Sequence, residues 1–356
     1  MKRSLYPSLQ ALLAAILFGA SAPFAKLLLG EIDPLPLAAL LYLGSGVGAW
    51  IMLLIQRAGN RRRETEPHPT KLDAPWLAGA ILSGGVAAPI LLMWGLNRTP
   101  ASTASLLLNF ESVATTLIAV LAFKEAVDRR ILWAIGLITL ASIFASWTGG
   151  AWGVSVGALG VIGACFLWGV DNNLTRHISA KNPLVIVGVK GLAAGSFSLL
   201  LALVLGKPIP ALNVTFLAML LGSVSYGLSI QLFILAMRGL GAARTSTLFG
   251  IAPFVGAILS LVMLREMPQA LFWAAVPVML AGAWLMLTER HDHHHGHTAA
   301  KHTHAHAHDD HHDHAHTSDV PLVNGLHSHP HMHEPLEHIH AHTPDLHHRH
   351  DHAGIS

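Results

Sequence analysis

Ten long apolar segments leave this chain few ways to fold. Each holds roughly 18 to 25 residues, enough for a helix rising ~1.5 Å per residue to cross ~30 Å of hydrocarbon. The segments cover residues 9–29, 35–56, 76–96, 101–123, 131–147, 154–176, 184–205, 212–237, 245–264 and 271–288. Apolar residues make up 52% of the chain and charged residues only 12%, about half the charged fraction of soluble domains. We therefore expect an all-α integral membrane protein with about ten transmembrane helices in contact with the lipid bilayer.

Basic residues are distributed unevenly over the loops that such helices would leave. With the N-terminus in the cytoplasm, the cytoplasmic segments before residue 291 hold fifteen Lys and Arg residues, and the opposite loops hold three: Arg98, Lys207 and Arg265. Cytoplasmic loops carry the excess of basic residues in membrane proteins. An even number of helices then places both termini in the cytoplasm. The expected location is the cell membrane, or the inner membrane of a prokaryote, as a multi-pass protein.

The two halves of the apolar body resemble each other. Residues 17–19 followed by Lys26 are similar to residues 167–169 followed by Arg176, at an offset of 150. Residues 105–107 through Lys124-Glu125 are similar to residues 246–248 through Arg265-Glu266, at an offset of 141. We interpret 1–150 and 151–290 as two repeats of five helices each. Because five is odd, the repeats would be inverted in the membrane, an arrangement typical of secondary transporters.

Several motifs of this body resemble the EamA-type drug/metabolite transporters. The stretch from Thr103-Ala104-Ser105 to Glu111-Ser112-Val113 and on to Glu125 is similar to the fourth-helix signature of that family. The segments Trp168-Gly169-x-Asp171-Asn172-Asn173 and Pro253-Phe254-Val255 are similar to its second-repeat signatures. The resemblance covers residues 9–288 and implies a carrier that alternately exposes a central cavity. The sequence departs from the family pattern at Ser112, where proline is frequent, so a helix break there is in doubt.

Glu111 is the most central ionisable residue, about ten residues from either end of its apolar segment. A charge at the bilayer centre costs at least ~2.5 kcal/mol, so it needs compensation. Asn109 and Glu111 fall on two polar lines of a helical wheel, which leaves Phe110, Ala114, Leu117 and Leu121 to face lipid. Glu111 is either a carboxylate that recognises a proton or a cation, or a protonated or hydrogen-bonded structural glutamate.

Asp171 and Lys190 lie at equal depth on consecutive apolar segments, ~10 Å from their cytoplasmic ends. This spacing favours a structural ion pair over a role in substrate binding. Asn172, Tyr226 and Gln231 are uncharged candidates for a substrate pathway, although polar contacts between helices would explain them nearly as well.

The last 66 residues, 291–356, contain 24 of the 26 histidines. They show no apolar periodicity, so we expect a disordered cytoplasmic tail. Neutral imidazole coordinates Zn, Ni, Co and Cu, and the densest runs supply the candidate metal ligands. These ligands are His302, His304, His306, His308, His311, His312, His347, His348 and His350.

Three functions remain open for this chain. The first is a secondary transporter that exports a small organic metabolite or drug. The second is a transition-metal exporter whose tail captures ions, although the body shows no cluster of His, Cys or Met at ligand spacing. The third is a metal-buffering membrane protein. Enzymatic motifs are missing from the sequence, so no catalytic residue or required cofactor is assigned, no nucleic-acid partner is expected, and a homodimer is left open.

The uneven distribution of basic residues predicts the topology directly. Reporter domains fused at Arg63 and after Thr288 should both be active only in their cytoplasmic form. A periplasmic signal from either fusion would contradict the orientation given above.

Overall fold

The computed structural model describes residues 2–59, 67–123, 129–147, 155–178, 181–240, 245 and 248–287, and the backbone of four short tail segments. The body between residues 2 and 287 is built from helices. In chain order these are α1 (Lys2–Gly19), α2 (Ser21–Leu28), α3 (Pro34–Gly59), η1 (Lys71–Asp73), α4 (Ala74–Ala80), η2 (Ile81–Ala87), α5 (Ala88–Asn97), α6 (Ala101–Leu107), α7 (Phe110–Phe123), α8 (Arg129–Ser146), α9 (Val156–Arg176), α10 (Pro183–Val204), α11 (Leu212–Gly222), η3 (Ser223–Leu228), α12 (Ser229–Leu240), α14 (Ala252–Met263) and α15 (Ala270–Leu287).

Seven helical segments of the described chain are long and apolar enough to cross a membrane, which makes this a multi-pass membrane protein. They are Tyr6–Leu28, Pro34–Ala58, Lys71–Asn97, Ala101–Ala122, Arg129–Ser146, Pro183–Val204 and Leu212–Ala236. The apolar helices Ala252–Met263 and Ala270–Leu285 are shorter. Helix α9 spans 21 residues and carries polar side chains near its end. The number of ten spans and the inverted repeat stay predictions.

Four of the seven spans are interrupted. The first changes direction at Ala20, between α1 and α2, and the fourth at Leu108 and Asn109, between α6 and α7. The third and the seventh each contain a π-helical turn, η2 and η3, in which backbone hydrogen bonds join residues five positions apart. The fourth span thus breaks without the proline that is frequent in the family, a few residues before Ser112.

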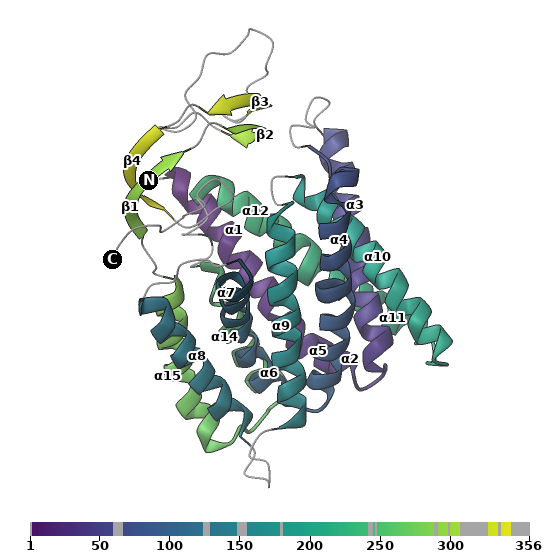
Figure 1. The fold of residues 1–356 in the computed structure, drawn as a ribbon. Helices are drawn as coiled ribbons and strands as arrows, with labels where there is room; N and C mark the ends of the chain where they lie inside the picture. The colour runs from purple at the N-terminus through teal and green to yellow at the C-terminus, as the bar shows by residue number, and fades with distance from the viewer. Residues whose placement is uncertain are drawn as a thin grey trace.

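The helices pack in pairs that are distant in sequence (Figure 1). Helix α3 packs on α10, α8 on α15, α1 on α12, and α9 on both α5 and α7. Glycines allow the closest approach: a Cβ added to Gly191 of α10 would lie 2.6 Å from the backbone nitrogen of Gly46 in α3. Small residues bring membrane helices together in this way because dispersion forces and backbone contacts replace the hydrophobic effect there.

The helical-wheel assignment of the lipid face of α7 is wrong for two of its four residues. Phe110 and Ala114 are buried, while Leu121 is exposed. Phe110 packs against Phe166 of α9 with 5.5 Å between ring centroids, and the backbone of Ala114 faces Gly169 of α9. The close crossing of α9 at Gly169 covers a face that the sequence of α7 alone assigns to lipid.

Four short segments of the tail have a described backbone, and the disorder of the tail as a whole stays a prediction. Strand β1 (His291–His297) pairs with β4 (Leu336–His342), and β2 (Ala300–His306) pairs with β3 (His327–His333), both antiparallel. The His-x-His runs have the two-residue period of a strand, and their backbone register sets histidine opposite histidine. His302, His304 and His306 belong to β2; the other six predicted ligands lie outside the described residues.

Candidate functional site

Asp171 of α9 and Lys190 of α10 form a buried ion pair, the contact that their equal depth predicts. The ammonium nitrogen of Lys190 donates to Asp171 Oδ2, and Thr175 donates its hydroxyl to Asp171 Oδ1 at 2.9 Å. The side chains of Asp171 and Lys190 are 6% and 17% exposed, so each charge has its opposite inside the bundle. Gly84 of η2 makes room for this carboxylate, because a Cβ there would clash with it.

The next residue of α9, Asn172, faces α7. Its amide nitrogen donates to Glu111 Oε1 at 2.9 Å and to Thr115 Oγ1 at 3.1 Å. Asn173 bonds the backbone oxygens of Thr115 and Gly169 and so fixes α9 against α7. The negative charge of Glu111 therefore receives a neutral amide hydrogen bond, whereas Asp171 is bonded by an ammonium group.

An aromatic group lies beside these residues and was not predicted from the sequence. Tyr42 of α3 donates its hydroxyl to the Gly84 oxygen at 2.6 Å, and the indole nitrogen of Trp168 donates to the same oxygen at 3.1 Å. Both bonds satisfy a carbonyl inside the π-helical turn η2. The sequence did single out Trp168, as part of the segment that resembles a family motif. Nothing in the sequence indicated that Trp168 would bind the Gly84 oxygen.

Tyr226, in the second π-helical turn, extends the aromatic group into the other half of the chain. Its ring lies 6.1 Å from that of Tyr42 and 5.7 Å from that of Phe18, measured between centroids. The candidate pathway residues Glu111, Asn172 and Tyr226 thus come from α7, α9 and η3. Asn109 is buried and donates to the Leu106 oxygen of its own span, and Gln231 lies half-buried on α12.

Residues 98–100, the short corner between α5 and α6, mark one end of the bundle, which we name the corner end. Helix α9 starts there, since Gly157 faces Thr99, and it ends at Arg176 at the opposite or far end. All seven residues of α6 are buried, and α14, α2, α9, α8 and α5 pack around it. Among the described helices, α9 and α8 make the main contacts with α7, and Ser112 and Asn172 are exposed. The bundle is therefore closed around α6 and more open around α7.

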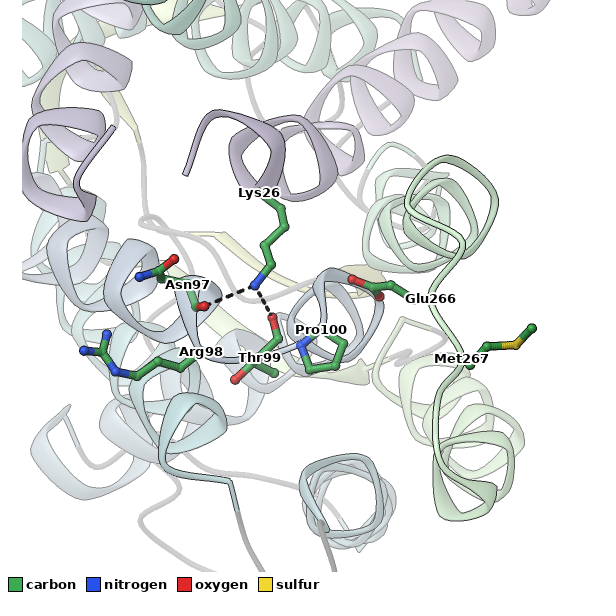
Figure 2. Close-up of a pocket in the computed structure, with 7 residues that line it drawn as sticks. All are labelled: Lys26, Asn97, Arg98, Thr99, Pro100, Glu266 and Met267. Atoms are coloured by element: carbon green, nitrogen blue, oxygen red, sulfur yellow. Dashed lines mark hydrogen bonds between the residues drawn. The ribbon is translucent and has the colours of Figure 1, made fainter. Parts of the chain in front are cut away.

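The corner end carries two further charged residues that contact backbone groups. Lys26 of α2 reaches the last carbonyls of α5, and Glu266, between α14 and α15, reaches the first amides of α6 (Figure 2). The sequence analysis identified Lys26 and Glu266 only as members of the two repeated motifs, without these partners. The related pair Lys124-Glu125 lies outside the described residues.

Within the described chain, no group of three or more His, Cys, Asp and Glu side chains is arranged to hold a metal ion. The single cysteine, Cys165, is buried and reduced. The body thus offers carboxylates, amides and aromatic rings to a solute, and no ready metal centre among its described residues.

Comparison with known proteins places this arrangement among transporters. A model of the EamA-like transporter family matches residues 6–147 and again 155–288. An uncharacterized transporter of Methanothermobacter thermautotrophicus is 29% identical over 298 residues, covering 80% of this chain and 87% of the relative. A probable terminal-alkyne amino-acid exporter of Streptantibioticus cattleyicolor is 26% identical over 232 residues, 61% of this chain and 74% of that protein. A solved crystal structure shares the fold, with a TM-score of 0.56 at 19% identity over 78% of this chain and 94% of the other.

The Asp171–Lys190 pair predicts a specific pattern in a double-mutant cycle. Asp171→Asn and Lys190→Gln should each lower the free energy of unfolding by about 3–5 kcal/mol, because each leaves one buried charge without its opposite. The double variant should recover part of the loss. Thermal unfolding of the purified proteins in detergent measures both effects.

Lys207→Gln serves as the control for this cycle. It removes an ion pair with Asp33 at 3.1 Å whose side chains are 43% and 40% exposed, so little stability should be lost. Strictly additive losses in the Asp171 and Lys190 double variant would show that the two charges do not stabilise each other.

Proposed function

Because this chain belongs to the EamA-like transporter family, we propose that it is a secondary transporter that exports a small organic metabolite or drug by alternating access. Family membership supports the general role of a membrane transporter. The solute, the direction and the mechanism are our proposals, and they rest on the position of Glu111 and Asn172 in the less closely packed half of the bundle.

Three observations support the two inverted repeats that alternating access uses in many carriers. The family model matches two consecutive stretches, whose boundary falls close to the proposed division at residue 150. The π-helical turns η2 and η3 occur 142 residues apart, from Ile81 to Ser223, close to the offset of the sequence repeat. Finally, α9 packs on η2 while α1, its counterpart in the first half, packs on η3.

Glu111 is the group that we propose to contact the solute or a coupling proton. It is half-buried, its amide partner Asn172 is exposed, and both lie where α7 is packed on fewer sides than α6. An ionisable group kept at membrane depth generally marks a substrate or proton pathway. Asp171 is a weaker candidate, because Lys190 already balances its charge.

The proposed solute is a small organic molecule that presents a cationic or hydrogen-bonding group to Glu111 and an apolar part to Tyr42, Trp168 and Tyr226. Carboxylates recognise ammonium groups, and aromatic faces attract both cations and apolar surface. An amino acid has this combination, and a relative is described as a probable amino-acid exporter. Amino acids therefore form the first panel of solutes to be tested.

The histidine-rich tail supports a second proposal, that of a transition-metal exporter or metal-buffering protein. The 24 histidines of the tail are an unusual density, and in β2 and β3 the register pairs His302 with His331 and His304 with His329. We favour the tail as an accessory binder of Zn, Ni, Co or Cu, because the metal-ligating residues gather there and not in the body.

Glu111→Gln tests the leading proposal. We expect export of the recognised solute to fall at least about tenfold per molecule in the membrane, because the amide keeps the size of the side chain and removes its charge. Efflux of labelled amino acids from loaded cells, normalised to protein in the membrane, measures this change. Ser112→Ala, which removes a hydroxyl bonded to the Asn109 oxygen, is the neighbouring control and should leave export unchanged. Normal export by Glu111→Gln would assign this carboxylate a structural role.

Truncation after Arg290 separates the two proposals. The shortened protein should still reach the membrane and export the organic solute, while the full chain should bind more Zn, Ni or Co. Binding should weaken as pH falls through about 6.5, because imidazole must be neutral to coordinate a metal. Metal content of the purified proteins and metal tolerance of cells carrying either form are the measurements. Tolerance lost together with the tail would favour the metal exporter over the metabolite carrier.

A further inference from the structure

Lys26 holds the end of α5 at the corner end of the bundle. Its ammonium nitrogen donates to the backbone oxygens of Leu96, Asn97 at 3.3 Å and Thr99 at 2.9 Å. These carbonyls lie where the helix and its regular hydrogen bonds end, and the Leu96 oxygen also accepts from the Thr99 amide at 3.5 Å. The three N–H groups of one lysine are thus matched by three acceptors, and the positive charge sits at the negative end of the helix dipole. Figure 2 shows this side chain pointing from α2 into the corner.

Glu266 holds the start of α6 in the complementary way. One carboxylate oxygen accepts from the Ala101 amide at 2.6 Å, and the other accepts from the Ser102 amide at 2.8 Å and from its hydroxyl. The preceding residue, Arg265, has a φ of 50°, a left-handed conformation that residues with a side chain seldom adopt. This strained turn directs the carboxylate toward α6, and such outliers tend to occur where the structure has a functional constraint.

The two contacts flank the same short connection, residues 98–100: Lys26 binds at its α5 side and Glu266 at its α6 side. Lys26 comes from the first half of the chain and Glu266 from the second, so the connection between α5 and α6 is held from two sides. Behind it, Ser105 of α6 packs against Gly256 of α14, within the closed part of the bundle. Any movement that separates α14 or α2 from α6 at this end has to break one or both contacts.

We propose that Lys26 and Glu266 form a latch that keeps the corner end closed, and that its release allows the bundle to open there. This inference rests on the proposed alternating access. A surface pocket of about 390 Å³ lies directly beside both side chains, lined by them together with Arg98, Pro100 and Met267. Because water can enter the pocket, released ammonium and carboxylate groups would be rehydrated and not left buried without partners. The latch is therefore strong enough to hold one state and still reversible.

Cysteine accessibility tests the latch without any substrate. In a Cys165→Ala background, Ser105→Cys reports on the corner end and Asn172→Cys on the far end. Each protein is labelled with a membrane-impermeant maleimide. Adding Lys26→Met or Glu266→Gln should raise the labelling of position 105 roughly tenfold. This is the change expected when a two-state equilibrium loses one charge-assisted contact. Labelling at position 172 from the opposite face should fall at the same time. Intact cells and inverted vesicles provide the two faces, so the opposite changes are detected in either orientation.

Lys207→Gln is the control, because it removes an ion pair with Asp33 that does not contact residues 98–100. It should change labelling at neither position. Should Lys26→Met fail to reach the membrane, Glu266→Asp carries the same expectation, since one methylene less prevents contact with both amides. Unchanged labelling, or a rise at both reporter positions that indicates general loosening, would overturn the latch. Export is measured separately in the Cys165→Ala protein, in which Lys26, Glu266 and Asn172 are intact. No export of any tested solute by this protein, together with the expected labelling in the reporter proteins, would contradict the proposed function and leave the latch in place.

Discussion

A backbone that crosses lipid must find a partner for each of its N–H and C=O groups, because no water is present to bind them. At three interruptions of the helices, side chains supply these partners. The Gly84 oxygen in η2 accepts from Tyr42 and Trp168. The carbonyls that end α5 accept from Lys26, and the amides that begin α6 donate to Glu266. Much of the polar chemistry of this bundle is thus arranged around backbone groups that a continuous helix would have satisfied by itself.

The carboxyl groups of Asp171 and Glu111 lie in different surroundings, although α9 takes part in both. Asp171 is buried against an ammonium group, and the ion pair links α9 to α10. Glu111 is met from α9 by an amide, which stabilises a carboxylate less than a cation does and leaves the exchange of a proton or a bound cation less costly. Adjacent residues of α9 therefore have different roles: Asp171 makes a structural contact with Lys190, and Asn172 makes a candidate functional contact with Glu111.

The sequence predicted those features that depend on depth along a helix. Apolar length located the membrane-spanning segments, and equal distance from the helix ends predicted the contact between Asp171 and Lys190. Features that depend on how helices cross could not be predicted from positions along a single helix. The burial of Phe110 and Ala114 follows from the approach of α9, and the bonds of Lys26 join residues about seventy positions apart.

The contacts of Lys26 also have a consequence for how the chain enters the membrane. Lys190 follows Asp171 by 19 residues, so the two charges can pair as soon as one helical hairpin has been inserted. Lys26 emerges from the ribosome 70 residues before Leu96 and is inserted with the first span, ahead of every carbonyl that will bind it. Until α5 arrives, this ammonium group has to stay at the water interface, which its flexible stem permits. The contacts that Lys26 makes at the corner end can therefore form only after the third span has been synthesised.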